Sequence, residues 1–117
     1  ARCESSFLPD LIDRSEAVAD VASLAAARVL SARIGRSCGA STGTNMWAVA
    51  RIVSGMAAAG EEGSVVTLLC DSGERYRSTH LDPHWLADRH LDLDPPRAAM
   101  EAFFERGVSP DAVLSER

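Results

Sequence analysis

A single run of β-branched and apolar residues limits what this chain can fold into. Val65 to Cys70 reads VVTLLC and is bounded by turn residues. Such a run predicts a strand that is buried on both faces, as in a parallel sheet. One strand cannot form a sheet, because its backbone N–H and C=O groups need a neighbouring strand as partner. We therefore expect the partner strands to lie outside these 117 residues, so that the chain is a fragment.

Most of the remaining apolar pattern predicts helices. Alanine, leucine and valine dominate the first helical segment, and Gly35 should end it. Residues 35–43 are small and glycine-rich and predict a loop, after which a helix should begin near Thr44 or Asn45. Helices are predicted over residues 17–34, 44–59 and 96–106, with a further short helix beginning at Pro110. The order helix, loop, helix, strand is typical of α/β proteins, whose helices cover a parallel sheet.

Composition excludes several classes of function. The net charge of −5 argues against a nucleic-acid-binding surface, which would be basic. No apolar run is long enough for a membrane-spanning helix, and the arginines are too scattered for a membrane-binding patch. The three cysteines have no paired spacing, so we expect no disulfide framework and a reducing cytoplasm.

Two motifs carry a family resemblance. The first is the loop Gly39-Ala40-Ser41-Thr42-Gly43-Thr44-Asn45, and the second is Cys70-Asp71-Ser72-Gly73-Glu74-Arg75-Tyr76, followed by Arg77-Ser78-Thr79. Together they resemble the carboxy-terminal part of the pyridoxal-phosphate (PLP) enzymes of the cysteine synthase and cystathionine β-synthase family. Residues 4–14 also resemble that family, so the resemblance covers residues 2–80. It implies a fragment of a three-layer fold type II domain, with helices packed on a parallel sheet. Residues 1–82 would belong to this domain, and residues 83–117 would form a variable helical tail.

The resemblance also implies roles for particular residues. In the family, the first hydroxyl of the loop hydrogen-bonds the nitrogen of the PLP ring, and that role falls on Ser41. Gly39 and Thr42 would flank it, while Cys70 and Asp71 would line the edge of the ring. A backbone loop that enters a helix also favours an anion or a polar ring, because the first N–H groups of a helix are unsatisfied. A neutral serine partner suits β-elimination and β-replacement.

The chain contains no lysine, since all twelve basic residues are arginine. Enzymes of the family hold PLP as a Schiff base on a lysine amine. We therefore expect no catalytic residue in this chain, with the lysine on a missing amino-terminal portion. The complete enzyme, expected to be a homodimer, would catalyse β-replacement on an amino-acid substrate such as O-acetylserine, with sulfide as the nucleophile. The alternatives are a cystathionine β-synthase-like activity and a lysine-less, non-catalytic remnant that acts as a binding module.

Other candidate sites are weaker. Cys38 lies near Ser41, but no histidine is close in sequence, so we interpret it as a small buried residue. We expect no metal site, and we interpret the histidines near the acidic residues Asp82, Asp88 and Asp92 as solvated. These histidines are His80, His84 and His90, and Pro83 disfavours a regular helix between the first two. Trp47 and Trp85 are interpreted as packing residues.

Overall fold

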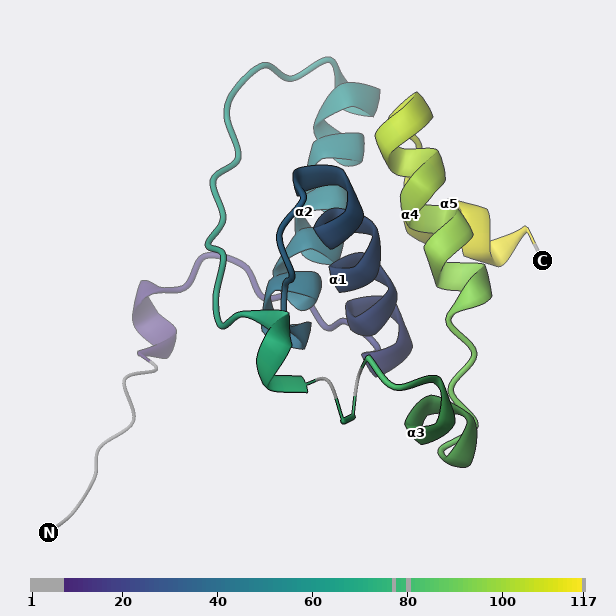
Figure 1. Cartoon of the computed structure of the whole chain (residues 1–117). Helices are drawn as coiled ribbons and strands as arrows, with labels where there is room; N and C mark the ends of the chain where they lie inside the picture. Colours follow the sequence, from purple (N-terminus) through teal and green to yellow (C-terminus); the bar gives the residue numbers. More distant parts are fainter. Residues whose placement is uncertain (1–7, 77, 80, 117) are drawn as a thin grey trace, which may run out of the picture.

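The computed structural model describes residues 8–76, 78, 79 and 81–116, and these residues are mostly helical (Figure 1). The α-helices are α1 (Asp20–Ile34), α2 (Ala40–Ala59), α3 (Pro83–Asp88), α4 (Asp94–Arg106) and α5 (Pro110–Ser115). Short 3-10 helices lie at Pro9–Leu11 and Gly73–Tyr76. Within the described residues, no helix is long and apolar enough to cross a membrane.

Helix α1 packs against both α2 and α4 (Figure 1). It begins at Asp20, three residues later than expected, and ends at Gly35, whose φ of 67° is the left-handed conformation that glycine tolerates. Alanine supplies most of its middle, and Ala25 and Ala26 are fully buried. Because alanine side chains are short, neighbouring helices can approach α1 closely on more than one side.

Helix α2 begins at Ala40, four residues before the expected start. The predicted loop therefore covers only residues 35–39, and the two hydroxyl residues Ser41 and Thr42 lie in the first helical turn. Gly43 explains how α2 fits against α1. A Cβ atom at this position would overlap the Ser23 carbonyl oxygen and lie 2.8 Å from the Ala27 backbone nitrogen. The glycine thus fixes the distance between the start of α2 and α1.

The main core lies where α1, α2 and α4 meet. Trp47 of α2 and Met100 of α4 are fully buried and pack against Ala22, Ala26 and Val29 of α1. Trp47 is therefore a packing residue, as predicted. Residues on both sides of position 83 contribute to one hydrophobic cluster. The domain boundary expected there stays a prediction.

A polar network attaches α5 to α2. The Arg51 guanidinium donates to both carboxylate oxygens of Asp111, at 2.6 and 3.2 Å, and the Trp47 ring N–H donates to Asp111 at 3.2 Å. Arg51 also donates to the Ala17 carbonyl at 2.6 Å and lies 3.5 Å from a Glu16 carboxylate oxygen. One arginine thus connects the last helix to the segment that precedes α1.

The strand expected at Val65 to Cys70 is not formed. The segment is irregular, and Val66 and Leu68 are 88% and 73% exposed. Among the described residues, pairing of the strand type is limited to one isolated antiparallel bridge, between Cys38 and Ser72. The physical reason is that the described part of the chain offers this segment no neighbouring strand, so neither its backbone nor its apolar side chains can be buried. The sheet of the expected α/β fold is therefore absent from the described residues.

The region after residue 80 contains a helix that was not expected. Pro83 occupies the first turn of α3, where its missing N–H costs nothing, and Asp82 caps the helix by accepting from the His84 N–H at 2.9 Å. The helix begins at Pro83 itself, so no described helix extends from residue 81 to His84, and the expectation that Pro83 disfavours a regular helix between His80 and His84 stays a prediction. The motif residues 4–6, Arg77 and His80 lie outside the described residues, as do the side chains of Arg75 and Tyr76.

Candidate functional site

The structure brings the two sequence motifs together at the start of α2. The Gly39 N–H donates to the Asp71 carbonyl, and the Gly73 N–H donates to the Ser37 carbonyl, both at 3.2 Å. A Cβ atom at Gly73 would collide with the Ser37 hydroxyl and lie 2.6 Å from the Cys38 carbonyl oxygen. The glycine of the second motif is thus required for the close approach of the two loops.

The two adjacent hydroxyls of the first motif have different environments. Thr42 is 1% exposed, and its Oγ1 accepts the Cys70 backbone N–H at 2.8 Å. Ser41 is exposed, and no described residue forms a hydrogen bond with its hydroxyl. Thr42 therefore holds the two motifs together, whereas the Ser41 hydroxyl is available to a ligand.

The start of α2 places backbone N–H donors beside the Ser41 hydroxyl. The first hydrogen bond of the helix runs from the Gly43 N–H to the Gly39 carbonyl at 3.2 Å. The N–H groups of Ala40, Ser41 and Thr42 precede this bond and carry the positive end of the helix dipole. The buried Gly39 caps the helix without a side chain, so no side-chain oxygen competes for these donors.

Cys70 and Asp71 lie beside this helix start and are both exposed. The Asn45 side-chain amide donates to the Cys70 sulfur at 3.7 Å. The structure thus places all five residues expected at the cofactor in one region. Gly39, Ser41 and Thr42 belong to α2 and its cap. Asp71 is hydrogen-bonded to Gly39, and Cys70 is hydrogen-bonded to Thr42. Their roles toward a cofactor stay predictions.

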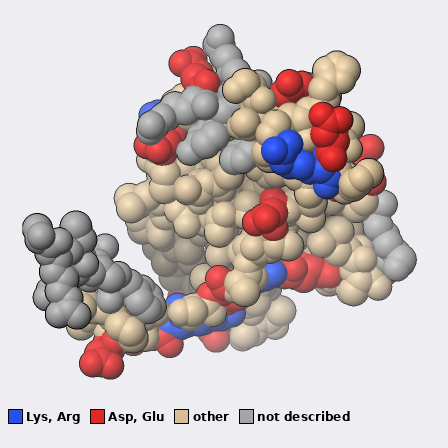
Figure 2. All heavy atoms as spheres, turned by 90° about the horizontal axis from the view of Figure 1, so that it is seen from below, with Lys and Arg blue, Asp and Glu red and all other residues tan. Residues whose placement is uncertain are grey.

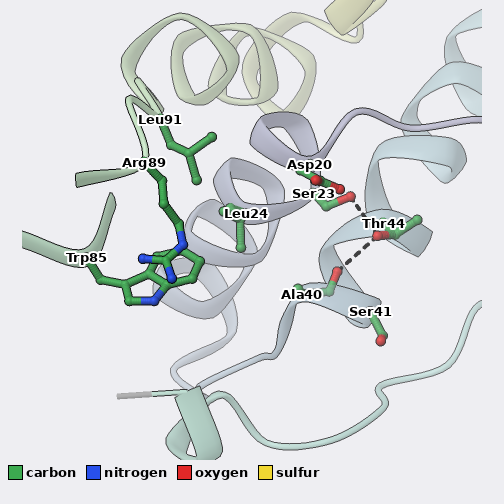
Figure 3. A pocket seen from close by; sticks show the side chains of 9 residues that line it. All are labelled: Asp20, Ser23, Leu24, Ala40, Ser41, Thr44, Trp85, Arg89 and Leu91. Carbon is green, nitrogen blue, oxygen red and sulfur yellow. Dashed lines mark hydrogen bonds between the residues drawn. The ribbon is translucent and has the colours of Figure 1, made fainter. Parts of the chain in front are cut away.

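A pocket of about 500 Å³ opens next to Ser41 (Figure 3). Its floor includes the hydrogen bond between the Ser23 and Thr44 hydroxyls, 2.6 Å long, which joins α1 to α2. Across the pocket, the Arg89 guanidinium lies over the Trp85 ring, 3.9 Å from its centroid (Figure 3). A hydroxyl-lined wall therefore faces an aromatic ring that carries a cation.

Sequence reasoning missed Arg89 and assigned Trp85 to packing alone. Both come from α3 and the turn that follows it, within the segment interpreted as a tail. Their spacing of four residues could have indicated the pair, since residues four apart share one side of a helix.

The described residues do not support the other candidate sites. Cys38 is buried, and its thiol donates to the Arg36 carbonyl at 3.5 Å, which fits a small packed residue. No group of three histidine, cysteine or acidic side chains in the described part of the chain could hold a metal ion. On the face shown in Figure 2, acidic and basic side chains are interspersed around a large uncharged area.

Comparison with known proteins identifies relatives over most of the chain. The chain is 49% identical over 102 residues to an L-cysteine desulfhydrase of Mycobacterium tuberculosis, and this match covers 87% of the chain and 28% of the relative. It is 38% identical over 88 residues to a putative cysteine synthase of Sinorhizobium fredii, covering 75% of this chain and 25% of that protein. It is 40% identical over 101 residues to cysteine synthase 2 of Neurospora crassa, covering 84% of this chain and 20% of that protein.

The chain thus spans between a fifth and three tenths of the length of these relatives. No protein-family model matches it, and no solved structure matches it either.

Proposed function

We propose that this chain, which belongs to the PLP-dependent cysteine synthase and cysteine desulfhydrase family, forms the part of a PLP site that faces the nitrogen of the cofactor ring. The observation that carries the proposal is the difference between the two adjacent hydroxyls. Thr42 is committed to the Cys70 N–H, whereas the Ser41 hydroxyl is exposed at the start of a long helix.

The residues present fit the pyridine end of PLP. A pyridine nitrogen accepts a hydrogen bond, and the Ser41 hydroxyl and the first amides of α2 are donors. The charged residues Asp20 and Arg89 line the same pocket as Ser41, and Asp71 belongs to the second motif. A serine partner leaves the ring nitrogen neutral, which suits bond cleavage at the β-carbon of an amino acid.

The chain's own residues hold this donor in place. Gly43 lets α2 approach α1, so that the position of Ser41 is set by helix packing rather than by a flexible loop. Thr42 holds Cys70 and Gly39 holds Asp71 at the start of the same helix, so the second motif lies at the edge of the proposed site. The chain therefore positions a cofactor, while proton transfer requires a lysine that these 117 residues do not contain.

When bound, PLP acts as an electron sink for carbanion chemistry at the α-carbon of an amino acid. We propose β-replacement as the reaction, in which sulfide takes the place of the acetate of O-acetylserine and cysteine is formed. Two of the three relatives are named as cysteine synthases, which supports this direction.

A second candidate reaction is the desulfhydration of cysteine. The relative with 49% identity is named as an L-cysteine desulfhydrase, and that identity exceeds those of the two synthases. In this reaction cysteine and water give sulfide, pyruvate and ammonia. Both reactions break a bond from the β-carbon to a leaving group, and both use the same neutral partner for the ring. A cystathionine β-synthase-like condensation and a non-catalytic binding module are the remaining alternatives.

The exposed segment from Val65 to Cys70 completes the proposal. In the complete protein we place it as a strand of a parallel sheet, paired with strands from outside this chain. Its apolar side chains, with Val66 88% exposed, and its backbone would both be buried there. The strand would then end at Cys70 and Asp71, where ligands bind in open α/β sheets. We expect a homodimer in the cytoplasm, where the free thiols Cys38 and Cys70 would remain reduced.

An activity comparison tests the proposal. The protein expressed from its complete reading frame is supplied with PLP and assayed in two ways. O-Acetylserine with sulfide should give cysteine if the enzyme is a synthase, whereas cysteine alone should give sulfide and pyruvate in equal amounts if it is a desulfhydrase. Absence of both activities, together with no uptake of PLP, would favour the binding module.

A further inference from the structure

A second pocket, separate from the one beside Ser41, is lined by three arginines. It has a volume of about 490 Å³ and shares no lining residue with the first pocket. Arg28 projects from α1, Arg36 from the loop after α1, and Arg97 from α4. Of the described residues that line the pocket, none is acidic. This concentration of positive charge occurs in a chain whose net charge is −5, so composition does not account for it.

The arginines of this pocket are held near one another at an electrostatic cost. Burial lowers the pKa of Arg28, and the nearby charge of Arg97 lowers it further. An anion in the pocket would relieve the repulsion between Arg28 and Arg97, because it would be attracted by both guanidinium groups.

Neutral groups complete the pocket. The Ser37 hydroxyl lines it beside Arg36, while the Ser31 hydroxyl is committed to the Ala27 carbonyl and to the Cys38 N–H. Guanidinium groups bind tetrahedral oxyanions through paired N–H donors, and a serine hydroxyl adds a further donor.

We propose that this arginine pocket binds a phosphate group, carried either by inorganic phosphate or by a small phosphate ester. The pocket is distinct from the Ser41 site but is connected to it through the loop of residues 35–39. In that loop, Arg36 lines the arginine pocket, the Ser37 carbonyl accepts from Gly73, and the Gly39 N–H donates to Asp71. A phosphate that fixes Arg36 would therefore also restrain the contact between the two motifs.

Isothermal titration of the protein from its complete reading frame tests the proposal. Inorganic phosphate and glycerol phosphate are titrated separately at constant ionic strength, with chloride as the reference anion. We expect saturable binding of phosphate that chloride does not reproduce. Equal affinity for the two ligands would identify the free phosphate group as the recognised element, and tighter binding of glycerol phosphate would identify an ester.

Two variants on one helix decide whether the arginine pocket is responsible. Arg97→Gln should weaken phosphate binding at least about tenfold, the effect of losing one hydrogen bond from a charged group. Arg106→Gln removes the same charge from the exposed last turn of α4, away from the pocket, and should change the affinity less than about twofold. Arg36→Gln should repeat the loss from a different element.

The melting temperature measured without phosphate provides a further test. Arg97→Gln should leave the melting temperature unchanged or raise it, because it removes repulsion with Arg28. The proposal is overturned if phosphate binds no better than chloride, or if Arg106→Gln weakens binding as much as Arg97→Gln does.

Discussion

Replacing Gly43 by alanine tests how α2 is held against α1. The added methyl group would overlap the Ser23 carbonyl oxygen and lie 2.8 and 2.9 Å from the backbone nitrogen and Cβ of Ala27. Backbone atoms cannot rotate away as the end of a long side chain can. The two helices must therefore separate, and α2 would carry Ser41 and Thr42 with it.

The size of the effect follows from two opposing contributions. Overpacking a filled site costs typically about 1–3 kcal/mol, and contact with backbone atoms favours the upper part of that range. Alanine returns up to about 1 kcal/mol through its higher helix propensity. We therefore expect Gly43→Ala to lower the free energy of unfolding by about 2 kcal/mol.

Gly55→Ala is the matched control, because Gly55 lies in the same helix and, apart from its chain neighbours and the adjacent backbone of α2, no atom lies within 4 Å of its added Cβ. This change should raise stability by up to about 1 kcal/mol. Urea unfolding of the complete protein measures both variants. If Gly43→Ala is as stable as Gly55→Ala, then the close approach of α1 and α2 at this glycine is not present in solution.

Three further predictions concern other contacts. Thr42→Val should lower the free energy of unfolding by about 1–3 kcal/mol, because it leaves the Cys70 N–H without its acceptor. It should also speed the reaction of Cys70 with a thiol reagent, whereas Thr42→Ser should have neither effect. The hydrogen bond from Arg51 lowers the pKa of Asp111, so its carboxylate contributes stability above about pH 4 that is lost as the pH falls through the lowered pKa. The stability difference between wild type and Asp111→Asn should therefore shrink in acid, and a difference that grows in acid would refute this assignment. The isolated chain should self-associate through its exposed apolar segment, and Leu68→Asp should reduce that association in size-exclusion chromatography.

The helices could be predicted from sequence because their signals are local. Alanine-rich periodicity indicated α1, and Gly35 and Gly107 marked helix ends in the left-handed conformation. The start of α2 was predicted four residues late, because the small residues that precede Thr44 resemble a loop in composition. In the structure, Gly39 caps the helix and Gly43 is required by contact with α1, which no local pattern reveals.

The prediction of a strand was wrong for a different reason. The residues from Val65 to Cys70 have strand propensity, but a strand exists only when another strand pairs with it. The described part of the chain contains no such partner, so the segment is irregular.

The two motifs predicted which residues group at the candidate site, whereas the different environments of the Ser41 and Thr42 hydroxyls are evident only in the structure. Sequence alone ranked Ser41 above Thr42 by resemblance. The structure adds that the Thr42 hydroxyl is already used by the Cys70 N–H. The arginine pocket could not be predicted, because Arg97 is distant in sequence from Arg28 and Arg36.

The central claim is that the Ser41 hydroxyl faces the nitrogen of the PLP ring, and Ser41→Ala in the complete, PLP-loaded enzyme tests it most directly. Loss of one neutral hydrogen bond costs roughly 1–2 kcal/mol, so we expect kcat to fall by about tenfold while the stability of the PLP-free protein is unchanged. The absorption spectrum of the bound cofactor should shift as well. An unchanged kcat and an unchanged cofactor spectrum would contradict the account.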